Sequence, residues 1–124
     1  MGQIFLVAGA ISGFLAVALG AFGAHALKQR LTADMLAVYD TAVQYHFYHT
    51  LALIAVALLA VYGVQGAWLK ASGWLFLVGT LLFSGSLYAL ALSGIKMLGA
   101  ITPLGGLCFL AAWLCLAVVA CRAL

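Results

Sequence analysis

The stretch that decides the fold is the first long apolar run, residues 4–27, which reads IFLVAGAISGFLAVALGAFGAHAL. It contains no lysine, arginine, aspartate or glutamate, and His25 is its only ionisable residue. A helix of about 20 apolar residues crosses a hydrocarbon core about 30 Å thick. Inside lipid the backbone amides and carbonyls must pair within the segment, so this run is expected to be a transmembrane helix.

The composition extends this interpretation to the whole chain of 124 residues. Only 6% of the residues are charged and 69% are hydrophobic, whereas a soluble domain has about 25% and about 45–50%. A small soluble domain exposes too much of its surface to keep so many apolar side chains from water. The formal net charge of +3 comes from few, scattered residues, which argues against a nucleic-acid-binding surface. The expected partner is therefore the lipid bilayer.

Three further apolar segments follow, at about residues 46–62, 73–93 and 103–121. Like the first segment, each is close to the length that spans a membrane. Short connections make neighbouring spans antiparallel. The sequence thus predicts an all-α fold, a single domain over residues 1–124. We expect an integral membrane up-down four-helix bundle with both termini on one side.

A more polar segment, about residues 33–45, separates the first two spans. Thr32 is a good N-cap residue, and Asp34 suits the positive end of a helix dipole. We expect a short amphipathic helix here, lying at the membrane interface and running or bending into the second span.

The remaining helix ends also carry sequence signals. Ser72 is expected to cap the third span, and Gly94 is a plausible residue to close it. Thr102 followed by Pro103 predicts the start of the fourth span, because proline is favoured in the first turn of a helix.

Small residues recur on one face of several spans. Since lipid tails are as apolar as leucine, transmembrane helices associate through close contact at small residues. The glycines expected to pack helices together are Gly9, Gly13, Gly20, Gly79 and Gly105. These contacts could lie within one chain or between copies in a homo-oligomer, and the sequence leaves both open.

The polar side chains cluster between residues 25 and 49, a window that holds all three histidines and both acidic residues. A hairpin of the first two spans brings His25 to the same membrane surface as His46 and His49, with His25 facing His49. Ionisable groups are costly in a membrane, so any chemistry of this protein is expected to involve this cluster. Its candidate ligand or polar-network residues are His25, His46, His49, Asp40, Gln44 and Tyr45.

Four interpretations of the cluster remain open. The histidines and Asp40 have a spacing that suits a metal ion such as zinc or iron. His25 and one histidine of the second span could be axial ligands of a haem. His25, Asp40 and His49 could relay protons. In the plainest interpretation, the histidines and tyrosines only form hydrogen bonds at the membrane interface.

A second set of polar side chains lies in the third span. The hydroxyl groups of Thr80, Ser84, Ser86 and Tyr88 could line a polar track through the bundle. Such a track would be expected in a small-solute or proton transporter, which is the second functional hypothesis.

Enzymatic signals are absent from the sequence. It contains no nucleophile–base pair, glycine-rich phosphate loop or matched pair of carboxylates. Cys108, Cys115 and Cys121 have no metal-binding spacing and are expected to be small packing residues. We therefore expect a non-enzymatic protein that needs no cofactor. Haem, quinone or metal binding through His25 and His49 is the third hypothesis.

Four separated stretches together resemble a known family. They are GAFGAH at residues 20–25, TAVQY at 41–45 with His49 downstream, LFSGSLY at 82–88 and ITPLGG at 101–106. The chain resembles the domain of unknown function 423 family of small bacterial inner-membrane proteins, which includes the eukaryotic transmembrane protein 256. The resemblance implies a four-span integral membrane protein and carries over no catalytic residue. The corresponding motif positions are Gly20, Gly23, His25, Gln44, Tyr45, His49, Ser84, Gly85, Ser86, Thr102, Pro103 and Gly105.

The basic residues give an expected orientation in the cell membrane. Lys28, Arg30 and Lys96 flank one side of the predicted bundle, and Lys70 and Arg122 flank the other. Because cytoplasmic loops carry the excess of lysine and arginine, this favours a cytoplasmic loop between His25 and His49. The first functional hypothesis is a protein that acts through helix packing, with a homo-oligomer or another membrane protein as partner.

Overall fold

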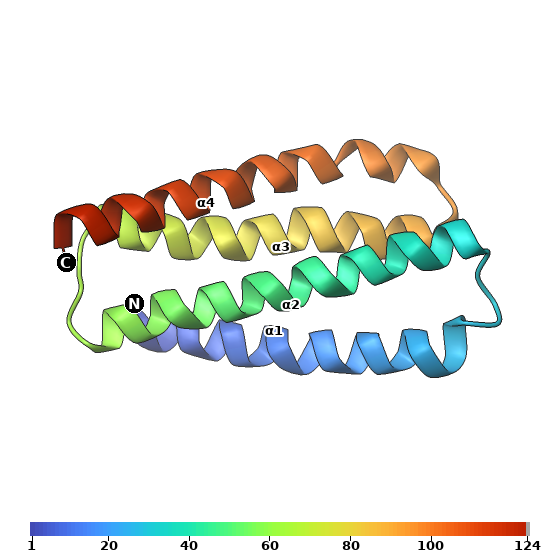
Figure 1. Cartoon of the computed structure of the whole chain (residues 1–124), viewed down its shortest axis with the longest axis horizontal. Helices are drawn as coiled ribbons and strands as arrows, with labels where there is room; N and C mark the ends of the chain where they lie inside the picture. Colours follow the sequence, from blue (N-terminus) through green and yellow to red (C-terminus); the bar gives the residue numbers. More distant parts are fainter. Residues whose placement is uncertain (124) are drawn as a thin grey trace.

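The computed structural model, which describes residues 1–123, is a set of antiparallel helices (Figure 1). The helices α1 (Gly2–Phe22), α2 (Ala33–Val61), α3 (Ala67–Ser93) and α4 (Thr102–Ala123) run alternately up and down. Short helices follow α1 and α3: the π-helix η1 (Gly23–Leu27) and the 3-10 helix η2 (Lys96–Ala100). All four long helices are apolar enough to cross a membrane. Both termini lie at the same end, so the predicted up-down topology is confirmed.

The order of packing places α2 and α3 at the centre of the molecule. Each long helix packs closely against the next long helix in the sequence. The outer helices, α1 and α4, lie on opposite sides of the central pair (Figure 1). Burial agrees with this arrangement. In the most apolar part of α2, 44% of the residues are buried, whereas in the most apolar part of the first span only 17% are buried. The outward faces of α1 and α4 are therefore left for lipid or for a partner.

The amphipathic helix predicted at residues 33–45 runs without a break into the second span. Those residues form the first half of α2, a single helix of 29 residues capped by Thr32, whose hydroxyl accepts a hydrogen bond from the Met35 amide. No glycine or proline interrupts the sequence between Ala33 and Val61, so nothing ends the helix within it. The Tyr39 side chain, expected near the interface, is fully buried in the bundle.

The other helix ends mostly follow the sequence signals. Gly94 adopts a left-handed conformation with φ 74° and closes α3, as predicted. The prediction for Ser72 is wrong, because α3 begins at Ala67 after Gly66, which has φ 121°. Ser72 is instead buried and donates a hydrogen bond to the Ala112 carbonyl of α4 at 3.0 Å. A small hydroxyl in a close helix contact bonds across to the neighbouring helix.

The predicted packing glycines contact neighbouring helices of the same chain. On α1, a Cβ atom at Gly9 would lie 2.7 Å from Ile54, and one at Gly20 would lie 3.3 Å from Val43, both on α2. On α4, a Cβ at Gly105 would collide with the backbone of Phe83 on α3. A Cβ at Gly79 would lie 2.6 Å from the Phe109 ring of α4, and one at Gly13 would be in ordinary contact with Thr50 of α2, at 3.5 Å. The glycine stripes are thus used inside the bundle.

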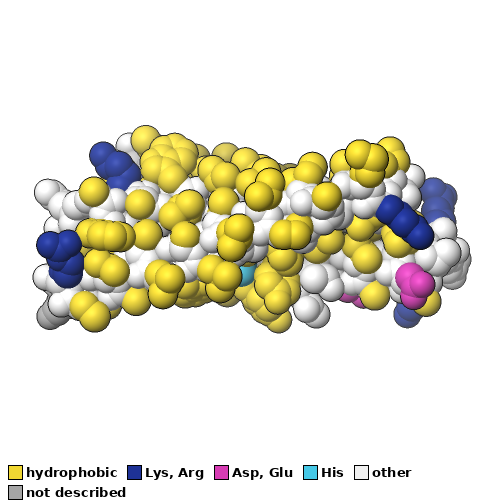
Figure 2. All heavy atoms as spheres, turned by 90° about the horizontal axis from the view of Figure 1, so that it is seen from above, with side chains coloured by type: hydrophobic (Ala, Val, Ile, Leu, Met, Phe, Trp, Pro, Cys, Tyr) yellow, Lys and Arg dark blue, Asp and Glu magenta, His cyan; other side chains and the backbone are white. Residues whose placement is uncertain are grey.

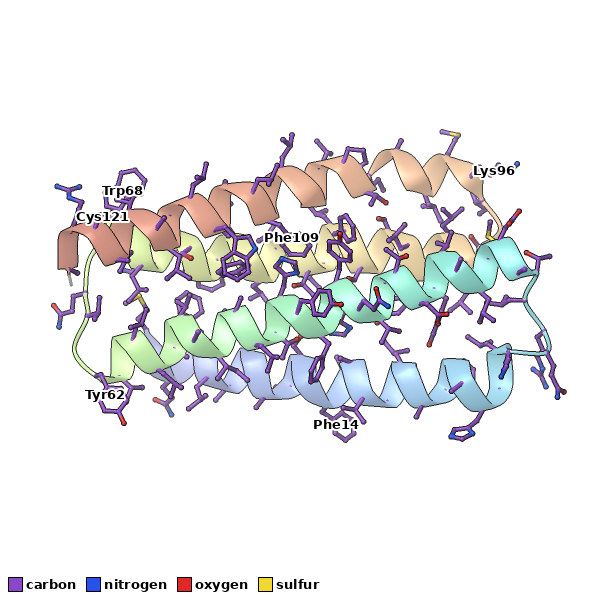
Figure 3. All side chains as sticks on the ribbon, in the orientation of Figure 1. Phe14, Tyr62, Trp68, Lys96, Phe109 and Cys121 are labelled. Atoms are coloured by element: carbon purple, nitrogen blue, oxygen red, sulfur yellow. The ribbon has the colours of Figure 1, made fainter. Side chains whose placement is uncertain are left out.

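Figure 2 shows charged side chains at the two ends of the molecule and hydrophobic side chains along the face between them. Lys96 marks one end, and Trp68 and Cys121 mark the other (Figure 3). This is the distribution expected of a protein whose middle lies in the hydrocarbon core.

Candidate functional site

Two of the three histidines lie at the middle of α2. His46 and His49 are about 20 Å from either end of this helix, at 1.5 Å per residue. Both side chains are buried. The prediction that they lie at the membrane interface is therefore wrong, since it depended on a second span beginning at residue 46.

His46 links three helices through hydrogen bonds to hydroxyl groups. Its Nδ1 lies 2.9 Å from the hydroxyl oxygen of Tyr88 on α3, and its Nε2 lies 3.0 Å from Oγ of Ser12 on α1. Ser12 Oγ is in turn 2.6 Å from Oγ1 of Thr50 on α2. We call Tyr88, His46, Ser12 and Thr50 the hydroxyl network. Neighbouring Tyr39 donates its hydroxyl hydrogen to the Leu19 carbonyl and packs edge-on against Tyr88.

His49 lies in a separate aromatic cluster between α2 and α4. Its ring stacks on Phe109 with centroids 3.5 Å apart and an interplanar angle of 6°. Phe109 is seen in Figure 3 among the aromatic side chains between the helices. The indole Nε1 of Trp113 lies 3.2 Å from His49 Nε2, and His49 Nδ1 lies 2.8 Å from the Tyr45 carbonyl. Phe76 of α3 packs edge-on against Trp113.

These contacts fix the protonation state of His49. An indole N–H can only donate and a carbonyl can only accept. Nε2 of His49 therefore accepts from Trp113, and Nδ1 carries the hydrogen that is donated to Tyr45. A second hydrogen on Nε2 would face the indole hydrogen, so this arrangement holds the imidazole neutral.

The remaining residues of the predicted cluster are not brought together. His25 lies in η1 with an exposed side chain, and it does not face His49. Asp40 and Gln44 are exposed on α2, and Tyr45 contributes its carbonyl and a ring stacked on Phe83. Among residues 1–123, no group of three or more histidine, cysteine, aspartate or glutamate side chains is placed to hold a metal ion. The interpretations that needed His25 beside His49 are therefore not supported by the geometry.

The predicted polar track is mostly a set of links between helices. Ser84 donates to the Ala42 carbonyl of α2 at 2.8 Å, and Ser86 lies 2.6 Å from Oγ1 of Thr102 at the start of α4. Thr80 donates to the Phe76 carbonyl of its own helix. Tyr88 belongs to the hydroxyl network. Throughout the described chain, every buried side-chain nitrogen and oxygen has a hydrogen-bond partner.

The buried histidines each line a groove on the side of the bundle. The larger, of about 910 Å³, lies between α2 and α4 over His49 and is walled by Tyr45, Tyr48, Phe83 and Trp113. The smaller, of about 440 Å³, lies between α1 and α3. Ser12, His46, Thr80, Ser84 and Tyr88 contribute to its lining.

Comparison with known proteins identifies the family. A family model described as "Protein of unknown function (DUF423)" matches residues 19–106. The UPF0382 membrane protein YwdK of Bacillus subtilis is 47% identical over 97% of this chain and 98% of its own length. The chain belongs to the DUF423 family. A UPF0382 membrane protein of Haemophilus influenzae is 49% identical over 94% of this chain and 93% of its own length.

The UPF0382 inner membrane protein YgdD of Escherichia coli is also similar, at 42% identity over 97% of this DUF423 chain and 91% of its own length. No solved structure matches the chain. Together with the four helices of membrane-spanning length, these relatives show that it is a multi-pass membrane protein. The family description assigns no activity, so the role of its buried polar residues is argued from geometry.

Three residues of the hydroxyl network and the aromatic cluster are not among the candidate residues named from the sequence. Ser12 and Thr50 are the hydroxyl partners that complete the hydroxyl network, and Trp113 fixes the tautomer of His49. A signal was present in this DUF423 sequence, since Ser12 and Thr50 are polar residues inside apolar spans. Such residues in transmembrane helices commonly bond across to a neighbouring helix.

Proposed function

We propose that this DUF423 protein is a non-enzymatic membrane protein that acts through lateral contact in the bilayer and self-associates along α4. The observation that carries the proposal is a row of exposed apolar residues on α4 at heptad spacing. Leu107, Leu110 and Leu114 are exposed by 63%, 63% and 69%. Ala117 and Cys121 continue the row at the next two positions and are also exposed.

The spacing of three and four residues places this row, the α4 seam, on one face of the helix. A row with this 3.5-residue period keeps facing a partner when two helices wind around each other with a left-handed supercoil. Many transmembrane helix pairs cross at about +20°, as such coiled coils do. Ala117 and Cys121 are small, which favours close approach near the C-terminal end of α4.

The membrane and the shape of α4 both suit a dimer of this kind. Copies inserted with the same orientation have parallel α4 helices, so a two-fold axis along the membrane normal brings the α4 seam against itself. Grooves flank α4 on both sides, one lined by Trp113 and Leu107 and another lined by Trp68 and Leu114. A ridge flanked by grooves can pack against an identical ridge.

The absence of catalytic function is supported by the state of the buried polar groups. Both ring nitrogens of His49 and both of His46 are already engaged in hydrogen bonds. A general acid or base must instead reach a proton on its substrate. Proton conduction is also poorly supported, because the chain of hydrogen bonds ends at Thr50. Beyond Thr50 lies an apolar cluster around Leu53, Val56 and Phe5, which offers no group to carry a proton.

Cysteine cross-linking in membranes tests the self-association. Single-cysteine variants are made with the other cysteines replaced by serine, leaving Cys121 alone or introducing Leu114→Cys. Oxidation is expected to give covalent dimers of both, because equivalent seam positions lie close together across a parallel dimer. The matched control is Phe14→Cys on the outward face of α1, where Phe14 is 73% exposed (Figure 3). Monomers at all three positions, or equal dimer yields at position 14 and at the seam, would contradict the proposal.

The proposal also includes the orientation of the chain in the membrane. Lys28, Arg30 and Lys96 lie at one end, which we place in the cytoplasm because basic residues are retained on that side. In a cysteine-free background, Gln29→Cys is expected to react with an impermeant maleimide only after the membrane is opened. Gln65→Cys, in the α2–α3 turn at the other end, is expected to react in intact cells. The reverse pattern would place the loop outside.

A further inference from the structure

The groove between α2 and α4 is lined mainly by aromatic rings. These rings belong to Tyr45, Tyr48, His49, Phe83, Phe109 and Trp113. The groove between α1 and α3 differs, because only His46 and Tyr88 among its lining residues are aromatic. Aromatic rings pack favourably against other flat rings, in stacked or edge-to-face arrangements. The α2–α4 groove is therefore better suited to a planar ring than to a flexible hydrocarbon chain.

Several of these rings are open to an occupant of the groove. Tyr45, Tyr48 and Trp113 are exposed by 38%, 55% and 46%. His49 and Phe109, stacked on each other, form a buried floor. The groove volume of about 910 Å³ lies within the range of about 300–1,000 Å³ that is usual for small-molecule sites. The groove therefore has the size and the accessible ring surface of a ligand site.

Two hydroxyl groups of the groove are without a hydrogen-bond partner. Within residues 1–123, Tyr45 takes part in hydrogen bonds through its backbone alone, and the phenolic hydroxyl of Tyr48, whose ring packs against that of Tyr45, is also unbonded. Both nitrogens of the adjacent His49 ring are already engaged. A polar group that faces hydrocarbon without a partner is costly. An occupant is therefore expected to supply hydrogen-bond acceptors.

The two tyrosines lie near the middle of the bundle. Phe47 is the middle residue of α2, and Tyr45 and Tyr48 are within two residues of it, which is about 3 Å along the helix axis. On the opposite side of the groove, Trp113 lies at the middle of α4. The ring centroid of Tyr45 is 5.9 Å from that of His49 and 6.0 Å from that of Tyr48. These rings therefore lie well inside the hydrocarbon core.

The ester carbonyls of phospholipids do not reach this depth. They lie at the edge of the hydrocarbon core, about 15 Å from its middle, and acyl chains contain no acceptor. The backbone carbonyls of a transmembrane helix are engaged within the helix itself. The α2 side of the groove extends only from Tyr45 to His49, about 6 Å, whereas a helix is about 10–12 Å wide. The occupant is therefore expected to be a small, membrane-soluble molecule with its own acceptors.

We infer that the α2–α4 groove binds the ring of an isoprenoid quinone, whose carbonyl oxygens accept hydrogen bonds from Tyr45 and Tyr48. A quinone ring is planar, its polar atoms are acceptors, and its isoprenoid tail is soluble in the hydrocarbon core. The donors differ from those of the third sequence-based hypothesis, because His25 is exposed elsewhere and the His49 nitrogens are engaged.

The quinone site is formed by helices of one chain, so binding does not require the proposed self-association. Leu107 and Leu110 of the α4 seam also line the groove. A partner copy on the seam would therefore cover the outer side of the site, whereas Tyr45 and Tyr48 of the same chain supply the donors.

Quenching of Trp113 fluorescence tests this inference. The protein carries Trp68→Phe and Trp74→Phe, which leaves Trp113 as its only tryptophan, and is titrated with decylubiquinone in phosphatidylcholine nanodiscs. Quenching is expected to saturate. One hydrogen bond is worth about 2- to 10-fold in affinity. Decylbenzene, which keeps an aromatic ring and the tail but has no carbonyl, should therefore compete at least about 2-fold more weakly than decylubiquinone.

Tyrosine variants test the two donors. Tyr45→Phe combined with Tyr48→Phe should weaken quinone binding by about 2- to 10-fold for each hydrogen bond lost. The matched control is Tyr62→Phe, since Tyr62 lies at the end of α2 outside the groove, and it should bind as the parent protein does. Quenching that does not saturate, equal affinity for decylbenzene, or unchanged affinity in the double tyrosine variant would overturn the inference.

Glycine variants test the groove itself. A Cβ at Gly106 would meet only the Phe83 ring, at 3.9 Å, so Gly106→Leu is expected to fold and to fill the groove. It should abolish saturable quenching. The control is Gly85→Leu, which lines the other groove and whose added Cβ meets no atom within 4 Å. Loss of binding in both glycine variants, or in neither, would overturn the inference.

The number of chains in each nanodisc separates this inference from the proposed self-association. Nanodiscs that hold one chain should bind decylubiquinone as well as those that hold two. Binding that requires two chains would overturn the inference, because a second copy would then complete the site. Absence of seam cross-links together with intact quinone binding would contradict only the self-association.

Discussion

The indole nitrogen of Trp113 lies 3.2 Å from Nε2 of His49, and this contact joins α4 to α2 at the middle of the bundle. The two helices have little direct backbone contact, whereas α3 packs closely against both of them. Aromatic side chains therefore bridge the distance, with Phe109 stacked on the histidine and Phe76 packed against the indole. His49 is better understood as part of this link than as a reactive group.

Replacing Trp113 by phenylalanine should weaken that link. Trp113→Phe keeps an aromatic ring but removes the only donor to His49 Nε2 in the described structure. We expect the free energy of unfolding to fall by about 0.5–1.5 kcal/mol, the usual range for such bonds between transmembrane helices. Unfolding in mixed micelles with increasing dodecyl sulfate gives the measurement. Trp68→Phe, at the half-exposed start of α3, is the control and should change stability less.

Two adjacent glycines of α4 should differ sharply in their tolerance of a methyl group. A Cβ at Gly105 would lie 2.7 Å from the Phe83 Cα, and backbone cannot move aside as a side chain can. Gly105→Ala is therefore expected to separate α3 from α4 and to cost about 1–3 kcal/mol. A Cβ at Gly106 would meet only the Phe83 ring, at 3.9 Å, so Gly106→Ala should be neutral or slightly stabilising. Equal effects of the two substitutions in the same unfolding assay would argue against the α3–α4 packing.

Ser12 and Thr50 should be energetically coupled. Thr50→Val is expected to cost about 0.5–1.5 kcal/mol because it breaks the 2.6 Å hydrogen bond between the two side chains. Ser12→Ala is expected to cost more, because it also removes the hydrogen bond to His46 Nε2. The double variant should cost less than the sum, since the same bond is lost only once. Thr41→Val is the control, because the Thr41 hydroxyl donates to Ala37 of its own helix. The effects of Thr41→Val and Ser12→Ala on the free energy of unfolding should therefore be additive. If the effects of Thr50→Val and Ser12→Ala are also strictly additive, the hydroxyl network is contradicted.

The features that depend on local chemistry could be predicted from the sequence. Apolar runs of membrane-spanning length gave the four helices, and Gly94 and Thr32 marked helix ends that the structure contains. These signals depend on the length of an apolar segment or on the backbone preference of one residue, so they do not require knowledge of the neighbouring helices.

The features that depend on depth and on side-chain contacts could not be predicted in this way. Asp34 and Asp40 made the first half of α2 resemble an interfacial helix, although Tyr39 and Ala42 on its other face are fully buried. Because of this, the sequence-based prediction placed His46 and His49 at the edge of the bundle, whereas they lie at its middle. His25 is only two residues from the buried Gly23, yet the direction of its side chain depends on η1, which the sequence did not indicate.

The protonation state of His49 tests most directly the claim that the buried histidines are structural. Solid-state NMR of protein labelled with ¹⁵N-histidine in lipid bilayers distinguishes protonated from unprotonated ring nitrogens, and a His49→Gln variant assigns the signals. The contacts to Trp113 and Tyr45 predict one neutral form of His49 at both pH 5 and pH 8, with hydrogen on Nδ1 and none on Nε2. A doubly protonated ring at pH 5, or hydrogen on Nε2 at either pH, would contradict the account.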